Sequence, residues 1–149
     1  MKAVIKTAVF VGAAILASGN AIAQGTAGGG GITVWKNGVP PGGISEKADF
    51  HDHLLEIVHR DANGQAELHK TQADVMVIQT GHATIETGGK VIDPKDTAPN
   101  EVRGSGIQGG VKHDVGPGDI INVPAGVPHQ FFVEKGTTIT YFVVKVTKQ

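Results

Sequence analysis

The segment from Gly118 to His129 constrains the fold of this chain more than any other segment. After the first glycine comes a short run rich in isoleucine and valine, which suits a buried β-strand. Gly126, flanked by Pro124 and Pro128, follows this run and favours a tight, stiff turn. Because proline cannot donate a backbone hydrogen bond to a sheet, the strand has to end at this turn. The segment therefore predicts a turn, a strand and a second turn that delivers His129 to the start of the next strand.

The same plan, in which glycine, proline and asparagine separate short apolar runs, continues through the chain from residue 53. Asn63-Gly64 between two such runs is a strong hairpin signal, and Gly88-Gly89 marks another turn. No run shows the apolar period of an amphipathic helix. About nine short strands are expected, over residues 54–60, 65–69, 74–80, 82–87, 90–92, 111–115, 120–123, 129–133 and 137–147. Such a sequence predicts an all-β sandwich or barrel.

Residues 93–110 do not follow this plan, because prolines and glycines interrupt them and apolar residues are few. A segment of this length and composition is expected to be a long loop, which in a compact domain is either functional or mobile. It lies between residues 67–74 and residues 118–129, which carry the candidate site residues. We therefore expect it near the mouth of the barrel, where Glu101 and Arg103 would contribute to ligand access or to a subunit contact.

The composition narrows the classes of site that the chain can build. The 149 residues have the size of one domain. There is no cysteine, which excludes disulfides, thiolate metal sites and cysteine nucleophiles. Any bound metal must therefore be held by carboxylates and by some of the seven histidines. A net charge of −1 without a basic stripe argues against nucleic acid as a partner.

The start of the chain has the three parts of a secretory signal peptide. Lys2 and Lys6 give a basic beginning, an apolar stretch follows, and Ala21-Ile22-Ala23 is a typical cleavage site. The apolar stretch is too short to span a bilayer comfortably, so no membrane anchor is expected after cleavage. We expect a periplasmic or secreted protein. The predicted parts are a signal peptide over residues 1–23, a leader or arm over residues 24–52 and a barrel domain over residues 53–149.

The spacing in the segment from Gly118 to His129 resembles the second signature motif of the cupin superfamily, G-x5-P-x-G-x2-H. Gly118, Pro124, Gly126 and His129 agree with it at fixed offsets. The family has an asparagine four positions after the histidine, where this chain has Val133. The resemblance implies a jelly-roll barrel, the double-stranded β-helix that cupins share. It also makes His129 a candidate metal ligand.

The first cupin motif, G-x5-H-x-H-x3,4-E-x6-G, is matched only in part. Counting back from Gly81 puts Asp74 in the place of the family's glutamate, His69 in that of the second histidine and Glu67 in that of the first. In another register, His69 replaces the first histidine and Thr71 the second. We prefer the former register because it keeps the family spacing. It also puts Glu67 and His69 on one face of a strand.

His51 and His53 imitate the His-x-His part of the first motif. They lack the glycine that should follow at the family spacing, since Gly64 comes one residue late. We therefore expect this pair to lie at a rim or on an edge strand, outside the site.

Imidazole and carboxylate groups together suit divalent metals such as Mn, Fe, Zn and Ni. His69, Asp74 and His129 supply such a set, and Glu67 could serve as a fourth ligand. The resemblance implies a metal-dependent enzyme that carries out dioxygenation, isomerisation or decarboxylation of a small molecule. The altered first motif supports a second hypothesis, a non-catalytic module that binds or senses a small molecule in the same barrel. Cupins often pair edge to edge, so the resemblance also implies a homodimer.

Overall fold

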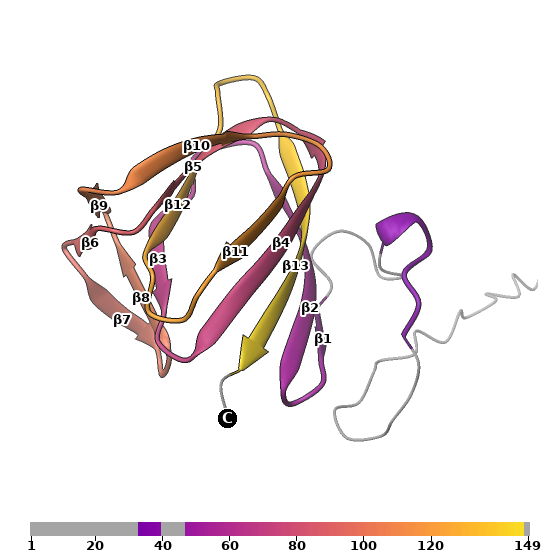
Figure 1. The fold of residues 1–149 in the computed structure, drawn as a ribbon, viewed down its shortest axis with the longest axis horizontal. Coiled ribbons are helices and arrows are strands. Elements are labelled where there is room, and N and C mark those ends of the chain that lie inside the picture. Colours follow the sequence, from indigo (N-terminus) through magenta and orange to yellow (C-terminus); the bar gives the residue numbers. More distant parts are fainter. Residues whose placement is uncertain (1–32, 40–46, 148–149) are drawn as a thin grey trace, which may run out of the picture.

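The computed structural model describes residues 33–39 and 47–147 of the chain (Figure 1). The predicted signal peptide and most of the predicted leader lie outside the described residues. Within the described ranges, no helix is long and apolar enough to cross a membrane. The described residues cover almost all of the predicted barrel domain.

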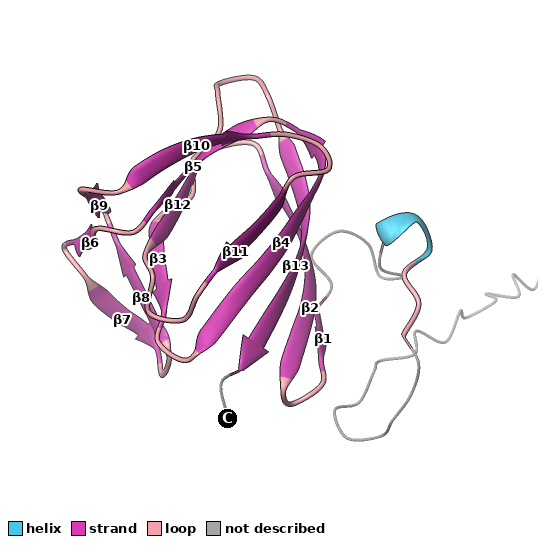
Figure 2. Ribbon diagram, viewed as in Figure 1, coloured by secondary structure: helices cyan, strands magenta, loops and turns pink. Residues whose placement is uncertain are grey.

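Strands dominate the described part of the chain (Figure 2). A single short 3-10 helix occurs in it, η1 (Lys36–Gly38). The strands are β1 (Lys47–Asp49), β2 (His53–Arg60), β3 (Ala66–His69), β4 (Gln72–Gly81), β5 (Ala83–Thr87), β6 (Lys90–Ile92), β7 (Lys95–Ala98), β8 (Glu101–Gly104), β9 (Gly106–Gln108), β10 (Val111–Val115), β11 (Ile120–Val123), β12 (His129–Phe132) and β13 (Ile139–Thr147).

Two antiparallel sheets face each other and form the barrel (Figure 1). One sheet has five strands in the order β1-β2-β13-β4-β11, and the other has six in the order β10-β5-β12-β3-β8-β7. A two-stranded ribbon of β6 and β9 lies beside them. Many neighbours are far apart in sequence, since the last strand, β13, pairs with both β2 and β4. The predicted fold class, an all-β jelly-roll barrel, is confirmed.

The core lies between the sheets and follows the two-residue period of the strands. On β13, Ile139, Tyr141 and Val143 are buried, and the residues between them are only partly covered. Phe131 of β12 stacks on Tyr141 with ring centroids 4.8 Å apart, so the two sheets meet at this pair. The other buried members of the core are Met76, Ile78, Ile85, Val115, Val123 and Val133. The same alternation directs residue 145, the next position of this series, toward the barrel interior.

Residues 93–110, which we expected to be a loop, form the three strands β7, β8 and β9. β8 pairs with β3, and β7 pairs with β8 at the edge of the six-stranded sheet. The prediction of a loop is wrong because exposed and half-exposed strand positions do not require apolar residues. Backbone pairing holds this segment in place, through β8 on β3 and β9 on β6, and a local side-chain pattern does not reveal such pairing. These three strands and β1 were not among those expected.

The junction between β4 and β5 depends on a glycine. Gly81 has a φ of +79°, and a Cβ atom there would collide with the carbonyl oxygen of Thr138. Gly136 has a similar φ of +84°, but open space surrounds it.

We expect Gly136→Ala to lower the free energy of unfolding by about 1 kcal/mol, because left-handed backbone disfavours alanine. Gly81→Ala should lower it clearly further, and urea denaturation measures both values. Equal losses in the two variants would contradict the collision at Gly81.

Candidate metal centre

Four polar side chains from three strands meet inside the barrel. Glu67 and His69 lie two residues apart on β3, so they point to the same face of that strand. Asp74 comes from β4, and His129 begins β12, where it pairs with Glu67. Their exposed fractions are 8% for Glu67, 5% for His69, and 1% for both Asp74 and His129. Polar groups buried to this degree need partners of opposite charge or hydrogen-bonding capacity.

The donor atoms of these residues are spaced much as ligands around one ion would be. Asp74 Oδ2 lies 3.2 Å from His69 Nε2 and 3.5 Å from His129 Nε2. Glu67 Oε2 lies 3.9 Å from His69 Nε2, and Glu67 Oε1 lies 3.7 Å from His129 Nε2. Donors that are about 2.1 Å from a shared ion are roughly 3.0–3.4 Å apart in tetrahedral or octahedral sites. The ligand atoms of Glu67, His69 and His129 all lie within 4.8 Å of one another, so these three residues could hold a metal ion.

The turn before β12 fixes the position of His129. The backbone N–H of Gly126 donates a hydrogen bond of 2.8 Å to the carbonyl oxygen of His69, which ties this turn to the end of β3. His129 Nδ1 lies 3.5 Å from the carbonyl oxygen of Val127, and Nε2 is the ring nitrogen near the other donors. A contact on the outer nitrogen orients a ligand ring and sets which nitrogen is available to an ion. The Gly126 turn thus joins both halves of the site.

A lysine that the sequence analysis did not select lies within this cluster. Lys145 Nζ is 2.8 Å from His69 Nε2, and 3.1 Å and 2.9 Å from the two carboxylate oxygens of Asp74. The sequence could have indicated Lys145, because it lies two and four residues after the buried Val143 and Tyr141 on β13. Alternate residues of a strand point to the same face. A charged residue at an inward position of an apolar strand requires a buried partner, here Asp74.

Two arginines hold Glu67, and one of them comes from the segment expected to be a loop. Arg103 Nη2 lies 3.0 Å from Glu67 Oε2, and Arg60 Nη2 lies 3.5 Å from Glu67 Oε1. Arg103 also pairs with Glu101 on the same strand, and Arg60 Nε donates to the Tyr141 hydroxyl at 2.9 Å. Glu101 and Arg103 thus lie beside the site, and their expected part in ligand access or in a subunit contact stays a prediction. Arg60 was missed, since the end of a hairpin strand gave no reason to select it.

The surroundings of Asp74 keep its carboxyl group ionised. Burial alone would raise its pKa, but the neighbouring imidazoles of His129 and His69 and the charge of Lys145 outweigh burial. Together they hold the pKa of Asp74 well below its usual range. Burial raises the pKa of Tyr141 to about 12, so this hydroxyl keeps its proton at neutral pH. The cluster thus combines an anionic oxygen donor with a nearby hydroxyl that can donate a hydrogen bond.

A cavity of about 120 Å³ opens beside the cluster. Its charged lining consists of Lys47, Glu56, Arg60, Glu67, Asp74, Glu101, Arg103 and Lys145. Four of these side chains are acidic and four are basic, so their charges balance. A cavity of this volume and polarity suits water molecules or a small polar ligand.

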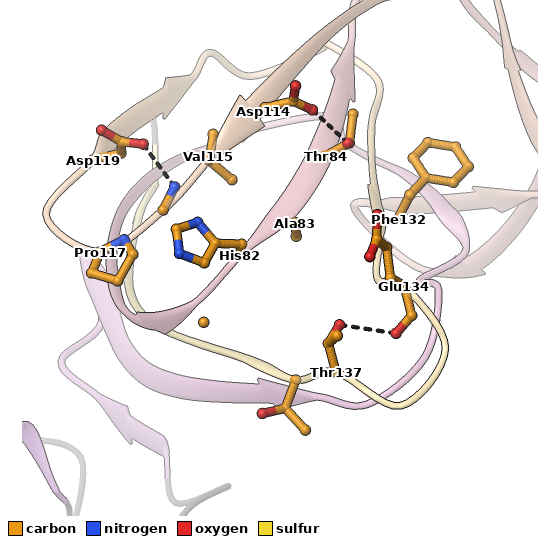
Figure 3. Close-up of a pocket in the computed structure, with 13 residues that line it drawn as sticks. His82, Ala83, Thr84, Asp114, Val115, Pro117, Asp119, Phe132, Glu134 and Thr137 are labelled. Carbon is orange, nitrogen blue, oxygen red and sulfur yellow. Dashed lines mark hydrogen bonds between the residues drawn. The ribbon is translucent and has the colours of Figure 1, made fainter.

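A larger cavity, of about 670 Å³, lies at the opposite end of β4 (Figure 3). Gly81 contributes to its lining and is seven residues from Asp74, a distance of roughly 20 Å along a strand. Two of the three acidic side chains there have local partners, since Asp114 accepts a hydrogen bond from Thr84, and Asp119 accepts one from a backbone N–H of its own turn (Figure 3). This cavity lacks the convergence of buried donors found beside β3, which makes the smaller cavity the candidate site.

The structure brings together all four residues that the sequence predicts as metal ligands, namely Glu67, His69, Asp74 and His129. Glu67 lies beside both imidazoles of this cluster. The Thr71 hydroxyl, the alternative candidate, is buried and has no hydrogen-bond partner among the described residues. His53 lies outside the cluster, where it pairs with Asp52 at 2.6 Å and stacks on Phe50.

Comparison with known proteins found similarity only to solved structures. No protein-family model matches the chain, and no curated protein matches its sequence. A hydroquinone 1,2-dioxygenase from a Sphingomonas species, solved with 4-hydroxybenzoate bound, is 10% identical with a TM-score of 0.49, over 66% of this chain and 62% of that one. A cupin protein from Bacteroides fragilis is 16% identical with a TM-score of 0.45, over 78% and 82% of the two chains. The CENP-C cupin domain of Drosophila melanogaster is 12% identical with a TM-score of 0.44, over 61% and 55%.

Two of these three structures are cupins by name. The chain also spans only part of the first solved structures that it matches, with 53%, 62% and 38% of their lengths covered.

The contact between Lys145 and Asp74 leads to a prediction about stability. In protein kept free of metal with EDTA, Lys145→Met and Asp74→Asn should each lower the free energy of unfolding by about 2–3 kcal/mol, because each leaves a buried group without its partner. The double variant should lose less than the sum, with a coupling energy of about 2 kcal/mol. Urea denaturation of the wild type and the three variants measures this value.

The control is the exposed pair of Lys70 and Asp96, whose Nζ and Oδ1 atoms are 2.6 Å apart. The same substitutions there should show a coupling energy below about 1 kcal/mol, because solvent screens the charges. Additive losses at Lys145 and Asp74 would contradict the ion pair.

Proposed function

We propose that this chain is an exported single-domain protein that holds a divalent metal ion in its barrel and acts on a small molecule. The observation that carries the proposal is the meeting of two imidazoles and two carboxylates, all buried, in one cluster. The ligands would be His69, His129 and Asp74, with Glu67 as a fourth.

The donor set supports a borderline metal such as Mn, Fe, Zn or Ni, because such ions accept both imidazole nitrogen and carboxylate oxygen. Asp74 is ionised and its Oδ2 is at ligand-like separations from both imidazoles. A bound ion of this kind would act as a Lewis acid on a substrate oxygen. Two histidines and one carboxylate leave positions open for a ligand, and dioxygenation, isomerisation and decarboxylation are all compatible with such a site.

The chain's own residues would select and orient the ligand. Arg103 and Arg60 present guanidinium groups beside Glu67, and the protonated hydroxyl of Tyr141 accompanies them. Guanidinium groups recognise carboxylate and other planar anionic groups. The cavity of about 120 Å³ is small by the standard of ligand pockets, which supports a substrate of few atoms.

One observation favours the second hypothesis, a non-catalytic module that binds or senses a small molecule. Glu67 already has two arginines, and Asp74 already has Lys145, so the charges in the cluster are balanced without an ion. A metal-loaded protein that turns over any candidate substrate would rule out pure binding.

Metal content tests the proposed site. Protein purified without a histidine tag and supplied with Mn, Fe, Zn or Ni should carry one of these metals in stoichiometric amount, as measured by elemental mass spectrometry. His129→Ala should lose most of it, because the variant removes a ligand from the centre of the cluster. Circular dichroism checks that the variant is folded.

The matched control is His82→Ala, which removes a histidine that lines the distant cavity. This variant should keep its metal. A wild-type protein that holds no stoichiometric metal, or a His129→Ala variant that holds as much as the wild type, would contradict the proposed site.

We also propose that the protein is exported, on the evidence of its first 23 residues, and that it forms a homodimer, on the evidence of the resemblance to cupins. Expression in a Gram-negative host should give a periplasmic form that begins at Gln24, because Ala21-Ile22-Ala23 directs cleavage there. Intact mass measurement of the periplasmic fraction checks this start. A cytoplasmic form that retains Met1 would contradict export.

A further inference from the structure

The strongest feature that the proposed function does not explain is the ammonium group inside the ligand cluster. Lys145 Nζ contacts His69 Nε2 at 2.8 Å and both oxygens of Asp74 at 3.1 Å and 2.9 Å. These are the same atoms that would bind the metal. We propose that Lys145 is a resident cation that competes with the metal ion for His69 and Asp74 and so sets the metal affinity of the site. This inference rests on the proposed metal site.

The contacts of Lys145 exclude simultaneous coordination by the same atoms. A neutral imidazole has one nitrogen lone pair to give, and at 2.8 Å the ammonium of Lys145 uses that of His69 Nε2. The carboxylate of Asp74 faces Lys145 with both oxygens. A dication bound to these donors would in addition lie close to a positive charge, which repels it. Metal entry therefore requires Lys145 to leave.

The pairing of strands in the sheet sets the position of Lys145. In the pairing of β13 with β4, Lys145 lies directly opposite Asp74. Residues opposite one another in antiparallel strands have adjacent side chains, and opposite charges there attract. The register that places Tyr141 and Val143 in the core also points Lys145 into the barrel. The lysine is thus held at the site by the same pairing that holds Asp74.

The lysine is the more accessible member of its pair with Asp74. The Lys145 side chain is 18% exposed, whereas that of Asp74 is 2% exposed. Glu56 and Glu101 line the cavity that Lys145 lines. An ammonium displaced by a metal would therefore move within a cavity that contains other carboxylates.

The test measures the affinity for Zn²⁺ by calorimetry on the full chain without an affinity tag, after removal of metals with EDTA. Lys145→Met keeps the length of the side chain and removes its charge. It should bind Zn²⁺ more tightly than the wild type by about ten- to a hundredfold, the factor that corresponds to losing hydrogen bonds with charged groups. Lys145→Gln, which retains a donor for Asp74, should show a smaller gain and serves if the methionine variant does not fold.

Lys47→Met is the matched control, because Lys47 lines the same cavity and pairs with Glu56 at 3.1 Å. It removes the same charge from the cavity without removing a contact to His69 or Asp74. Its affinity for Zn²⁺ should differ from that of the wild type by less than about threefold, since its exposed charge is screened. An equal gain in Lys47→Met and Lys145→Met would overturn the proposal, because general charge would then explain it.

The outcomes separate this inference from the proposed function. Binding by the wild type with no gain in either Lys145 variant overturns the inference and leaves the metal site standing. Binding by the Lys145 variants alone supports the inference and contradicts a metal site in the wild type. If neither the wild type nor either Lys145 variant binds Zn²⁺, both the inference and the proposed metal site are overturned.

Discussion

The site depends on the pairing of β13 with β4. This pairing closes the middle of the five-stranded sheet and sets Lys145 opposite Asp74. It also fixes which residues of β13 face inward, since successive side chains point to opposite faces. Tyr141 and Val143 then fill the core, and the next inward position carries a charge that contacts His69 and Asp74. A shift of one residue in this register would take the lysine out of the barrel and leave Asp74 buried without its partner.

The fold could be predicted largely from local signals. Glycine, proline and asparagine turns divided the chain at nearly the right places, and the segment from Gly118 to His129 was correctly assigned as turn, strand and turn. The segment 93–110 was not, because its strands are held by backbone pairing, β8 with β3, β7 with β8 and β9 with β6, and its side chains are mostly polar. Such pairing depends on the partner strand, which a local pattern does not reveal.

The candidate site was predictable where residue spacing carries the information. The offsets of the two motifs found Glu67, His69, Asp74 and His129, and the structure brings these four together. The motif offsets could not identify the positively charged side chains that surround these four residues. Arg60, Arg103 and Lys145 come from three other strands, and only the barrel brings them next to the carboxylates. Their presence changes the physical description of the site, from a set of metal donors to a network whose charges are balanced by lysine and arginine.

One cluster would serve a metal ion and the ammonium group of Lys145 in turn. A crystal structure of the Co²⁺-loaded protein, with anomalous data collected at the cobalt edge, tests it most directly. We expect an anomalous peak about 2.1 Å from the Nε2 atoms of His69 and His129, with Lys145 Nζ moved out of contact with both His69 and Asp74. A loaded protein with no peak in the barrel, or with Lys145 still on His69 and Asp74 beside a bound ion, would contradict it.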